Sequence, residues 1–512
     1  MHPRRFATET PDKPAYIMAG SGESVSYAQL EARANQVAHG LRGQGVAAGD
    51  VVALMVENHP RLYEFLWGAQ RIGVHYLLIA TGLTAGEASY ILRDSDARIA
   101  IVSRKVLDRL GEDADLPCPV AILDDDLVAT IRRFPETPVT NEAPGTDMLY
   151  SSGTTGFPKG IKSPLPASFD AAPRAVSIGA QYFGCGQDSI YLCPAPLYHA
   201  APLRWSLAIH RHGGTVVLME RFDAAAALAA IERHRVTVAQ VVPTHLARML
   251  ALPAEVRERH DLSSLVSVFH AGAPCPVPLK QRAIDWLGPI VGEFYSGTEG
   301  VGITVATCAD WLARPGTVGR AVQGKIRICD ADGEPLPVGE EGLVRFANAN
   351  PFAYHNDPER TAASFNQHGW PTLGDIGRVD ADGFLFLTDR ANFMIISGGV
   401  NIYPQEIENR LLQHPAVADA AVIGVPDEEM GERVVALVEP AAWPVNDAAA
   451  LAADLDRFAR GGLSAVKVPR RYVFRATLDR TDTGKLVKRR LRDTLLAEDQ
   501  TSSSTASSGV AA

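Results

Sequence analysis

The sequence has few cysteines and no spacing that would pair them. Its 512 residues include six cysteines, which are scattered and never form a Cys-x-x-Cys unit. Neither a disulfide framework nor a structural zinc site is therefore expected. Isolated cysteines of this kind are typical of reduced thiols, so we expect a cytoplasmic protein.

The chain also lacks an excess of positive charge and any long apolar run. Lys and Arg number 49 against 59 Asp and Glu, which gives a formal net charge of -10. A mildly acidic chain has no long-range attraction for phosphate backbones, so we expect no nucleic-acid partner. No window approaches the roughly 18 continuous apolar residues of a membrane span. A small-molecule partner is expected, and an oligomer stays open.

Apolar residues follow an alternation of strands and helices over the first 300 positions or so. Runs such as 51–58, 97–103 and 215–219 predict buried strands, whereas the periodic stretches 26–43 and 223–234 predict helices. Strands that alternate with helices favour parallel sheets covered on both faces.

The pattern changes near residue 316, where Asp332-Gly333 and Asp382-Gly383 join short apolar runs as β-turns or hairpins do. After residue 389 helices and strands alternate again over roughly 100 residues, the size of one domain. We therefore predict an α/β protein. Its large N-terminal domain (1–389) has two parallel-sheet α/β subdomains and a small β-barrel-like subdomain, and an α+β C-terminal domain (390–495) precedes a disordered tail (496–512).

The densest chemical signal is the string YSSGTTGFPKG at 150–160. Its glycines let backbone N–H groups approach a ligand closely. Hydroxyl groups and the Lys159 ammonium complete the donors that a polyphosphate requires. A Walker A loop is excluded, because it needs Ser or Thr after the lysine and here Gly160 follows.

This string resembles the phosphate loop of the adenylate-forming superfamily, which includes acyl-CoA synthetases, firefly luciferase and the adenylation domains of peptide synthetases. Further strings follow in the order of that family, and the resemblance covers about 20–495. They are AGAPCP (271–276), YSGTEG (295–300), LGDIG (373–377), DRANFMIISGG (389–399) and LDRTDTGK (478–485). The resemblance implies ATP, Mg²⁺ and coenzyme A as reactants and cofactor, and a mobile C-terminal domain.

The resemblance also implies a set of ATP-binding residues. They are Ser151, Ser152, Gly153, Thr154, Thr155, Gly156, Lys159, Gly272, Ala273, Pro274, Tyr295, Ser296, Asp375 and Arg390. In the family the tyrosine stacks on adenine and the aspartate holds both ribose hydroxyls. Thr298 matches the family's threonine that contacts phosphate. Glu299 matches the glutamate that binds Mg²⁺, an ion that prefers hard carboxylate oxygens. Leu373 stands where the family usually has Thr.

Four residues near the domain boundary and in the C-terminal domain complete the implied machinery. Lys485 matches the catalytic lysine, and Asn392 occupies the hinge position, where Asp or Lys is frequent. Asn tolerates unusual backbone angles and so can serve as a pivot. Gly398 and Gly399 would line the tunnel for the pantetheine arm of coenzyme A.

His199 matches the family's histidine near the acyl carboxylate. Residues 191–203 contain no Asp, Glu, Lys or Arg, so an uncharged acyl group is favoured. The expected acyl-binding residues are His199, Ala200, Trp205, Gln240, Ala271, Gly297, Val301 and Gly302. Most are apolar or small, as suits a bulky hydrophobic acid. The surrounding strings most resemble fatty-acid and bile-acid CoA ligases.

We therefore expect an acyl-CoA ligase that forms an acyl-adenylate, releases pyrophosphate and transfers the acyl group to coenzyme A. Two alternatives stay open. The enzyme could pass its acyl-AMP to a carrier protein or a partner enzyme, because both reactions share every adenylation residue. A nucleotide-binding pseudoenzyme with a regulatory role is disfavoured by the presence of Lys159, Glu299, Asp375, Arg390 and Lys485.

Overall fold

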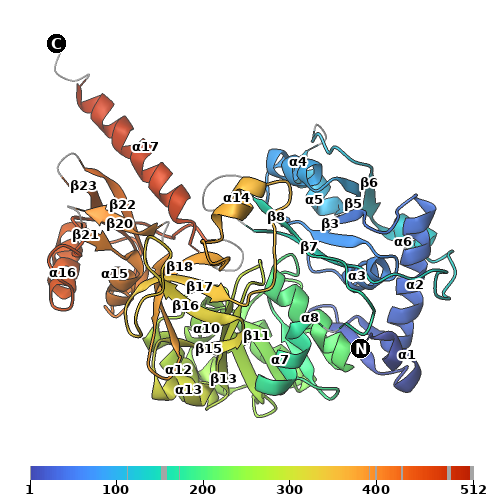
Figure 1. The fold of residues 1–512 in the computed structure, drawn as a ribbon. Coiled ribbons are helices and arrows are strands. Elements are labelled where there is room, and N and C mark those ends of the chain that lie inside the picture. The colour runs from blue at the N-terminus through green and yellow to red at the C-terminus, as the bar shows by residue number, and fades with distance from the viewer. Residues whose placement is uncertain are drawn as a thin grey trace.

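The computed structural model of the chain describes residues 2–111, 114–151, 158–171, 173–390, 393–397, 400–427, 430–480 and 486–507. Figure 1 shows a large N-terminal body beside a smaller C-terminal one, from which helix α17 (Lys488–Ser507) projects. Within these residues, no helix combines the length and apolar character that crossing a membrane requires.

Six strands form the sheet of the first α/β subdomain, in the order β6-β5-β3-β4-β7-β8. Neighbours are parallel except β7 and β8, which pair antiparallel on either side of the expected phosphate loop. All five residues of β3 are buried, as the apolar run at 51–58 predicts. The strands are β3 (Val51–Met55), β4 (His75–Leu78), β5 (Ala97–Ser103), β6 (Val120–Leu123), β7 (Thr146–Ser151) and β8 (Lys159–Lys162).

A second sheet of thirteen strands forms the rest of the large body. Its parallel part is β1 (Pro14–Met18), β10 (Thr215–Leu218), β9 (Ile190–Cys193), β11 (Val238–Val241), β12 (Ser267–His270) and β13 (Val291–Ser296), with β2 (Ser24–Ser26) antiparallel at one edge. Its antiparallel part follows in the order β14 (Ile303–Ala306), β15 (Thr317–Gln323), β19 (Leu385–Arg390), β18 (Thr372–Val379), β17 (Gly342–Ala347) and β16 (Lys325–Cys329). The two parallel sheets are confirmed. The expected β-barrel-like subdomain corresponds to β15–β19, which continue the second sheet.

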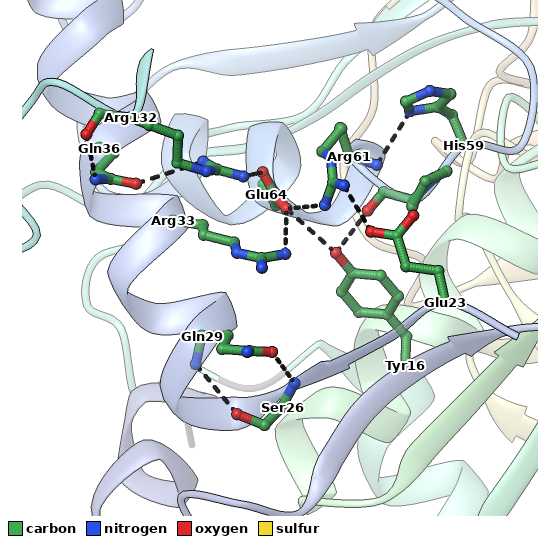
Figure 2. A network of polar contacts seen from close by, with 11 residues as sticks. Tyr16, Glu23, Ser26, Gln29, Arg33, Gln36, His59, Arg61, Glu64 and Arg132 are labelled. Atoms are coloured by element: carbon green, nitrogen blue, oxygen red, sulfur yellow. Dashed lines mark hydrogen bonds and ion pairs between the residues drawn. The ribbon is translucent and has the colours of Figure 1, made fainter. Parts of the chain in front are cut away.

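Fourteen helices of the described large body cover these sheets. They are α1 (Arg4–Glu9), α2 (Tyr27–Gly43), α3 (Leu62–Gln70), α4 (Ala85–Asp94), α5 (Arg104–Leu110), α6 (Asp125–Ile131), α7 (Arg174–Tyr182), α8 (Ala200–His212), α9 (Ala224–His234), α10 (Pro243–Leu250), α11 (Ala254–Glu258), α12 (Val277–Leu287), α13 (Cys308–Ala313) and α14 (Pro358–Ala363). A capping box between Ser26 and Gln29 starts α2 (Figure 2). These reciprocal bonds satisfy backbone groups that a helix start leaves without partners.

A buried carboxylate ties the two α/β subdomains together (Figure 2). Glu64 of α3 is only 2% exposed and pairs with Arg33 at 3.2 Å, Arg61 at 3.0 Å and Arg132 at 2.7 Å. The Tyr16 hydroxyl, on strand β1 of the second sheet, donates to the Pro60 carbonyl at 2.5 Å and lies 3.5 Å from the same carboxylate. A buried carboxylate is costly unless it is fully paired, so this network holds α2, α3 and β1 in a fixed arrangement.

The C-terminal body has its own sheet and its own apolar core. The sheet runs β21-β20-β23-β22, and β24 pairs parallel with β23. The elements are β20 (Ile395–Ser397), β21 (Val400–Ile402), α15 (Pro404–Leu411), β22 (Val417–Asp427), β23 (Gly431–Pro440), α16 (Ala448–Arg460), β24 (Arg471–Phe474) and α17. Both apolar clusters of this body draw every described member from residue 395 onward. It is thus an α+β unit with an independent interior.

The C-terminal tail differs from the expected disorder over 496–512. Helix α17 continues to Ser507, and its residues Leu491 and Leu495 are buried among side chains of β22 and β23. No Pro or Gly occurs between Lys488 and Ser507. The helix is anchored by two buried leucines, and this stretch contains no strong helix breaker. It can therefore continue through its run of serines.

Candidate active site

Three expected nucleotide-binding residues meet where β13, β18 and β19 lie close together. The Tyr295 hydroxyl donates to Asp375 Oδ2 at 2.5 Å, and Arg390 Nε donates to Asp375 Oδ1 at 3.1 Å. The antiparallel register pairs Asp375 with Arg390, so the two strands themselves bring the guanidinium to the carboxylate. Each carboxylate oxygen can accept more than one hydrogen bond, so Asp375 keeps acceptor capacity for ribose hydroxyls.

The phenol of Tyr295 is held neutral and oriented. Burial, reinforced by the charge of Asp375, raises the pKa of Tyr295 well above its ordinary value. The ring lies nearly parallel to that of Phe346, with centroids 6.4 Å apart. An aromatic ring that is packed on one side and fixed by its hydroxyl can offer its other face to a base.

Glu299, the expected metal-binding residue, lies with Tyr354 and Lys159. The Tyr354 hydroxyl donates to Glu299 Oε1 at 2.9 Å, and Lys159 Nζ lies 4.9 Å from the centroid of the Tyr354 ring. Tyr354 also forms a β-bridge with Ile161 of β8. Burial, followed by the charge of Arg360, lowers the pKa of Lys159. One tyrosine thus connects the strand after the phosphate loop to the expected metal carboxylate.

The residues present fit a magnesium ion. The half-buried Glu299 carboxylate uses Oε1 to accept from Tyr354, which leaves Oε2 for a cation. In the part of the chain that the structure describes, no three His, Cys, Asp or Glu side chains gather as a metal cluster. Mg²⁺ is commonly held by one or two carboxylates with substrate phosphates and water. Glu299 would therefore hold the ion together with the phosphates of ATP.

The backbone of Thr298 is positioned by an ion pair from the first subdomain. Arg204 of α8 donates from Nη1 to the Thr298 carbonyl at 3.4 Å, and its Nη2 pairs with Asp147 of β7 at 2.8 Å. Because β7 leads into the expected phosphate loop, Arg204 connects that loop's strand to the segment 296–300. Sequence reasoning missed Arg204 and Asp147, which lie 57 positions apart.

The expected adenine segment, Gly272, Ala273 and Pro274, follows directly after strand β12. Gly272 has a φ of +87°, a left-handed backbone that residues with a Cβ rarely adopt. The Lys280 ammonium and the Glu293 carboxylate form a buried ion pair at 2.6 Å. Since Lys280 lies on α12 and Glu293 on β13, the pair joins the helix after this segment to the strand that carries Tyr295.

A histidine adjoins this buried pair. His270 Nε2 lies 3.6 Å from Glu293 Oε2. Burial, together with the positive charge of Lys280, lowers the pKa of His270 well below its ordinary value, so the imidazole is neutral. Lys280 Nζ also lies 5.2 Å from the centroid of the Trp311 ring. One lysine therefore supplies the positive charge that this carboxylate needs.

The expected acyl-binding residues divide between two apolar clusters. Trp205 and Ala271 belong to the largest cluster, against which Ala200 packs, whereas Val301 belongs to the cluster of Phe346. His199 is the N-cap residue of α8, immediately before Ala200. Gln240 is buried on β11.

Two expected glycines mark close approaches in this region. A Cβ at Gly297 would lie 2.4 Å from Leu373 Cδ2, and one at Gly302 would lie 2.1 Å from Phe346 Cδ1. The space beside these glycines is thus filled by Leu373 and Phe346, which sequence reasoning did not place in the acyl site. Ser296 Oγ donates to the Gly302 carbonyl at 2.9 Å and stabilises the same turn.

Several expected site residues lie outside the described part of the chain. They are Ser152, Gly153, Thr154, Thr155, Gly156, Asn392, Gly398, Gly399 and Lys485. The backbone of Ser151 ends β7. The roles expected for all of these residues stay predictions.

Comparison with known proteins agrees with this architecture. The AMP-binding enzyme family matches residues 3–353, and the AMP-binding enzyme C-terminal domain matches 406–485. The long-chain-fatty-acid–CoA ligase FadD13 of Mycobacterium tuberculosis is 34% identical over 96% of this chain and 97% of its own. The fatty acid–[acyl-carrier-protein] ligase ScoC of Streptomyces coeruleorubidus is 32% identical over 95% and 94%.

The same fold occurs in solved structures. The anthranilate CoA ligase AuaEII in complex with anthranoyl-AMP is 26% identical, covers 97% of both chains and superposes with a TM-score of 0.84. The predicted fold and the predicted adenylate-forming class are confirmed. The chain therefore belongs to the AMP-binding enzyme family and is an acyl-CoA ligase of the adenylate-forming type.

Proposed function

We propose that this ligase activates an uncharged, hydrophobic carboxylic acid with ATP, releases pyrophosphate, and then transfers the acyl group to coenzyme A. A free carboxylate is inert to a thiol because its leaving group would be oxide. Attack of the carboxylate on the α-phosphate gives an acyl-adenylate, whose leaving group is AMP. Both reacting groups are anions, so the site must neutralise charge and hold them in line.

The observation that carries this proposal is the meeting of Tyr295, Asp375 and Arg390. In a nucleotide complex, the ring of Tyr295 faces the adenine, and Asp375 accepts hydrogen bonds from the ribose hydroxyls. Arg390 contacts the ribose or the α-phosphate. Lys159 and Thr298 contact the β- and γ-phosphates. Glu299 would hold Mg²⁺, which supplies positive charge to the phosphates.

The C-terminal domain provides the residues that change between the two half-reactions. Lys485 bridges the carboxylate and the α-phosphate during adenylation. The domain then rotates about Asn392, and Gly398 and Gly399 line the path of the thiol. One active site can in this way perform two reactions in turn. The separate apolar core of the C-terminal body supports this role.

A second acceptor is the alternative, because the acyl-carrier-protein ligase ScoC matches nearly the full chain. In that case a carrier protein or a partner enzyme, rather than coenzyme A, receives the acyl group. We also place the reaction in the cytoplasm, since the six cysteines are all free thiols, as is usual in a reducing compartment.

A panel of acids assayed twice tests the proposal. Pyrophosphate exchange measures adenylation alone, and thioester formation with coenzyme A or with a phosphopantetheinylated carrier protein measures transfer. We expect exchange with hydrophobic acids and thioester with coenzyme A. Exchange without acyl-CoA, together with acylated carrier, would favour the alternative. No exchange with any acid would refute both.

A further inference from the structure

Gln240 has a buried amide group whose N–H donor has a protein partner, whereas its oxygen acceptor has none among the described residues. The residue is 1% exposed, and its Nε2 donates to the carbonyl of Val241 at 2.7 Å. No donor in the described part of the chain lies within hydrogen-bond distance of Oε1. The orientation follows from chemistry, because the reversed amide would set its oxygen against the Val241 carbonyl oxygen, and two acceptors repel. Oε1 is therefore a buried acceptor in need of a donor.

The position of Gln240 in the sheet places it between two loops of the candidate active site. Strand β11 pairs parallel with β9 on one side and β12 on the other. Strand β9 leads into the segment that ends at His199, and β12 leads into the adenine segment. The carboxyl ends of parallel strands face one crevice, in which α/β proteins bind their ligands. Gln240 is the penultimate residue of β11 and lies at that edge.

The alternation of side chains assigns Gln240 to the face of the expected acyl pocket. Ala239 and Val241 belong to one apolar cluster, whereas Val238 belongs to the other, with Trp205 and Ala271. Because successive side chains of a strand point to opposite faces, Gln240 shares the face of Trp205.

The cross-strand neighbour of Gln240 supports this assignment. Gln240 is in register with Phe269, whose ring centroid lies 4.7 Å from that of Trp205. Phe269 has no polar hydrogen, and the indole N–H of Trp205 forms no hydrogen bond with Oε1, so this side of Gln240 leaves Oε1 without a partner. A hydroxyl or N–H group on the bound acid could supply the donor that the described protein groups do not.

We propose that Gln240 selects acids whose hydrophobic body carries a neutral hydrogen-bond donor, a hydroxyl or an N–H group, away from the carboxylate. This inference rests on the proposed function and narrows its substrate class. A site that holds a buried acceptor discriminates against the analogue without a donor, because that analogue leaves the acceptor without a partner. An acid with a plain alkyl chain has no such donor and would leave Oε1 without a partner.

The test compares matched acids in wild type and in Gln240→Leu, which roughly keeps the side-chain size and removes the Oε1 acceptor together with the Nε2 donor. The pairs are cinnamic acid with its three ring-hydroxylated isomers, and a fatty acid with its ω-hydroxy form. By pyrophosphate exchange, we expect wild type to favour at least one hydroxylated acid by about tenfold or more in kcat/KM. In Gln240→Leu that ratio should fall close to one.

Two further measurements separate this role from a structural one. Ser206→Ala, which removes a buried hydroxyl on α8, should leave the ratio unchanged. Gln240→Leu also removes the Nε2 bond to the Val241 carbonyl, but that carbonyl keeps the N–H of Ala271 at 3.4 Å, so we expect only a small fall in the ligand-free Tm. Should that variant not fold, Gln240→Met replaces it.

The outcomes separate the inference from the function on which it rests. An unchanged ratio in Gln240→Leu, or a wild type that prefers none of the hydroxylated acids, would overturn the inference while exchange with plain acids upholds the proposed function. Absence of exchange with every acid would overturn both.

Discussion

Tyr354 donates a hydrogen bond of 2.9 Å to Glu299 across 55 positions of the sequence. The bond leaves one oxygen of Glu299 for a cation, and it orients that carboxylate from a loop bridged to β8. Groups that orient a metal ligand in this way commonly change metal affinity by about 10–100-fold when they are removed. We therefore propose that Tyr354 positions the Glu299 carboxylate.

Replacement of Tyr354 by Phe should raise the Mg²⁺ concentration needed for half-maximal pyrophosphate exchange by about tenfold. The ring beside Lys159 is kept, whereas the hydroxyl bond to Glu299 is lost. Titration of exchange with Mg²⁺ at saturating ATP measures the shift. Tyr472→Phe in the C-terminal domain, whose hydroxyl has no partner among the described residues, is the matched control. Equal Mg²⁺ requirements in wild type and Tyr354→Phe would contradict the assignment.

Lys485→Ala should lower pyrophosphate exchange by about a hundredfold or more, as when one charge-stabilising group is lost from a site. A preformed acyl-adenylate no longer needs this ammonium, so its transfer to coenzyme A should persist. Both half-reactions are measured separately. Arg490→Ala removes an exposed cation five positions further on and should change neither rate. Undiminished exchange in Lys485→Ala would remove the lysine from the mechanism.

Asn392→Pro tests the proposed pivot, because proline fixes φ near about -65°. The adenylation pose needs Lys485 in the site, and the transfer pose needs Gly398 and Gly399 there instead. A variant trapped in one orientation should keep one half-reaction and lose the other, and we expect adenylation to survive. If both half-reactions slow equally, or neither does, the pivot lies elsewhere.

Lys280→Met should destabilise the fold by about 3–5 kcal/mol, because it leaves the buried carboxylate of Glu293 without its partner. Urea denaturation measures the loss. The double variant Lys280→Met/Glu293→Leu replaces the pair with apolar groups and should recover most of that stability. A double variant as unstable as the single one would show that packing of the Lys280 stem, rather than charge, accounts for the effect.

The stability that Lys280→Met loses relative to wild type should depend on pH. Burial raises the pKa of Glu293, and Lys280 opposes this rise, so loss of the lysine raises the pKa further. An acid with a raised folded-state pKa binds more protons when folded than when unfolded, and its stability is lost as pH rises through that pKa. The stability lost in Lys280→Met should therefore grow as pH rises above the ordinary pKa of a glutamate, about 4.3. The double variant lacks the Glu293 carboxyl, so its stability relative to wild type should not fall in this way as pH rises.

Apolar patterning was sufficient to predict the sheets, because strands such as β3 and β11 are buried on both faces and read as continuous apolar runs. The motifs named Asp375 and Arg390 as separate nucleotide contacts, and their pairing across the hairpin of β18 and β19 emerges only from the structure. Tyr354 and Arg204 could not be predicted in the same way. Their contacts join residues that are far apart in the sequence, and local residue spacing does not show which distant segments become neighbours in the fold.

The independent apolar core of the C-terminal body has a consequence for recombination between relatives. No described apolar cluster contains residues from both sides of 390. A crossover at that point would exchange one complete interior for another, whereas a crossover between residues 16 and 132 would divide the Glu64 network (Figure 2). We therefore expect that the smaller body can be exchanged for that of a relative without repacking the apolar core of the larger, provided that surface contacts such as Gln405 N–H to Asp389 Oδ2 are kept.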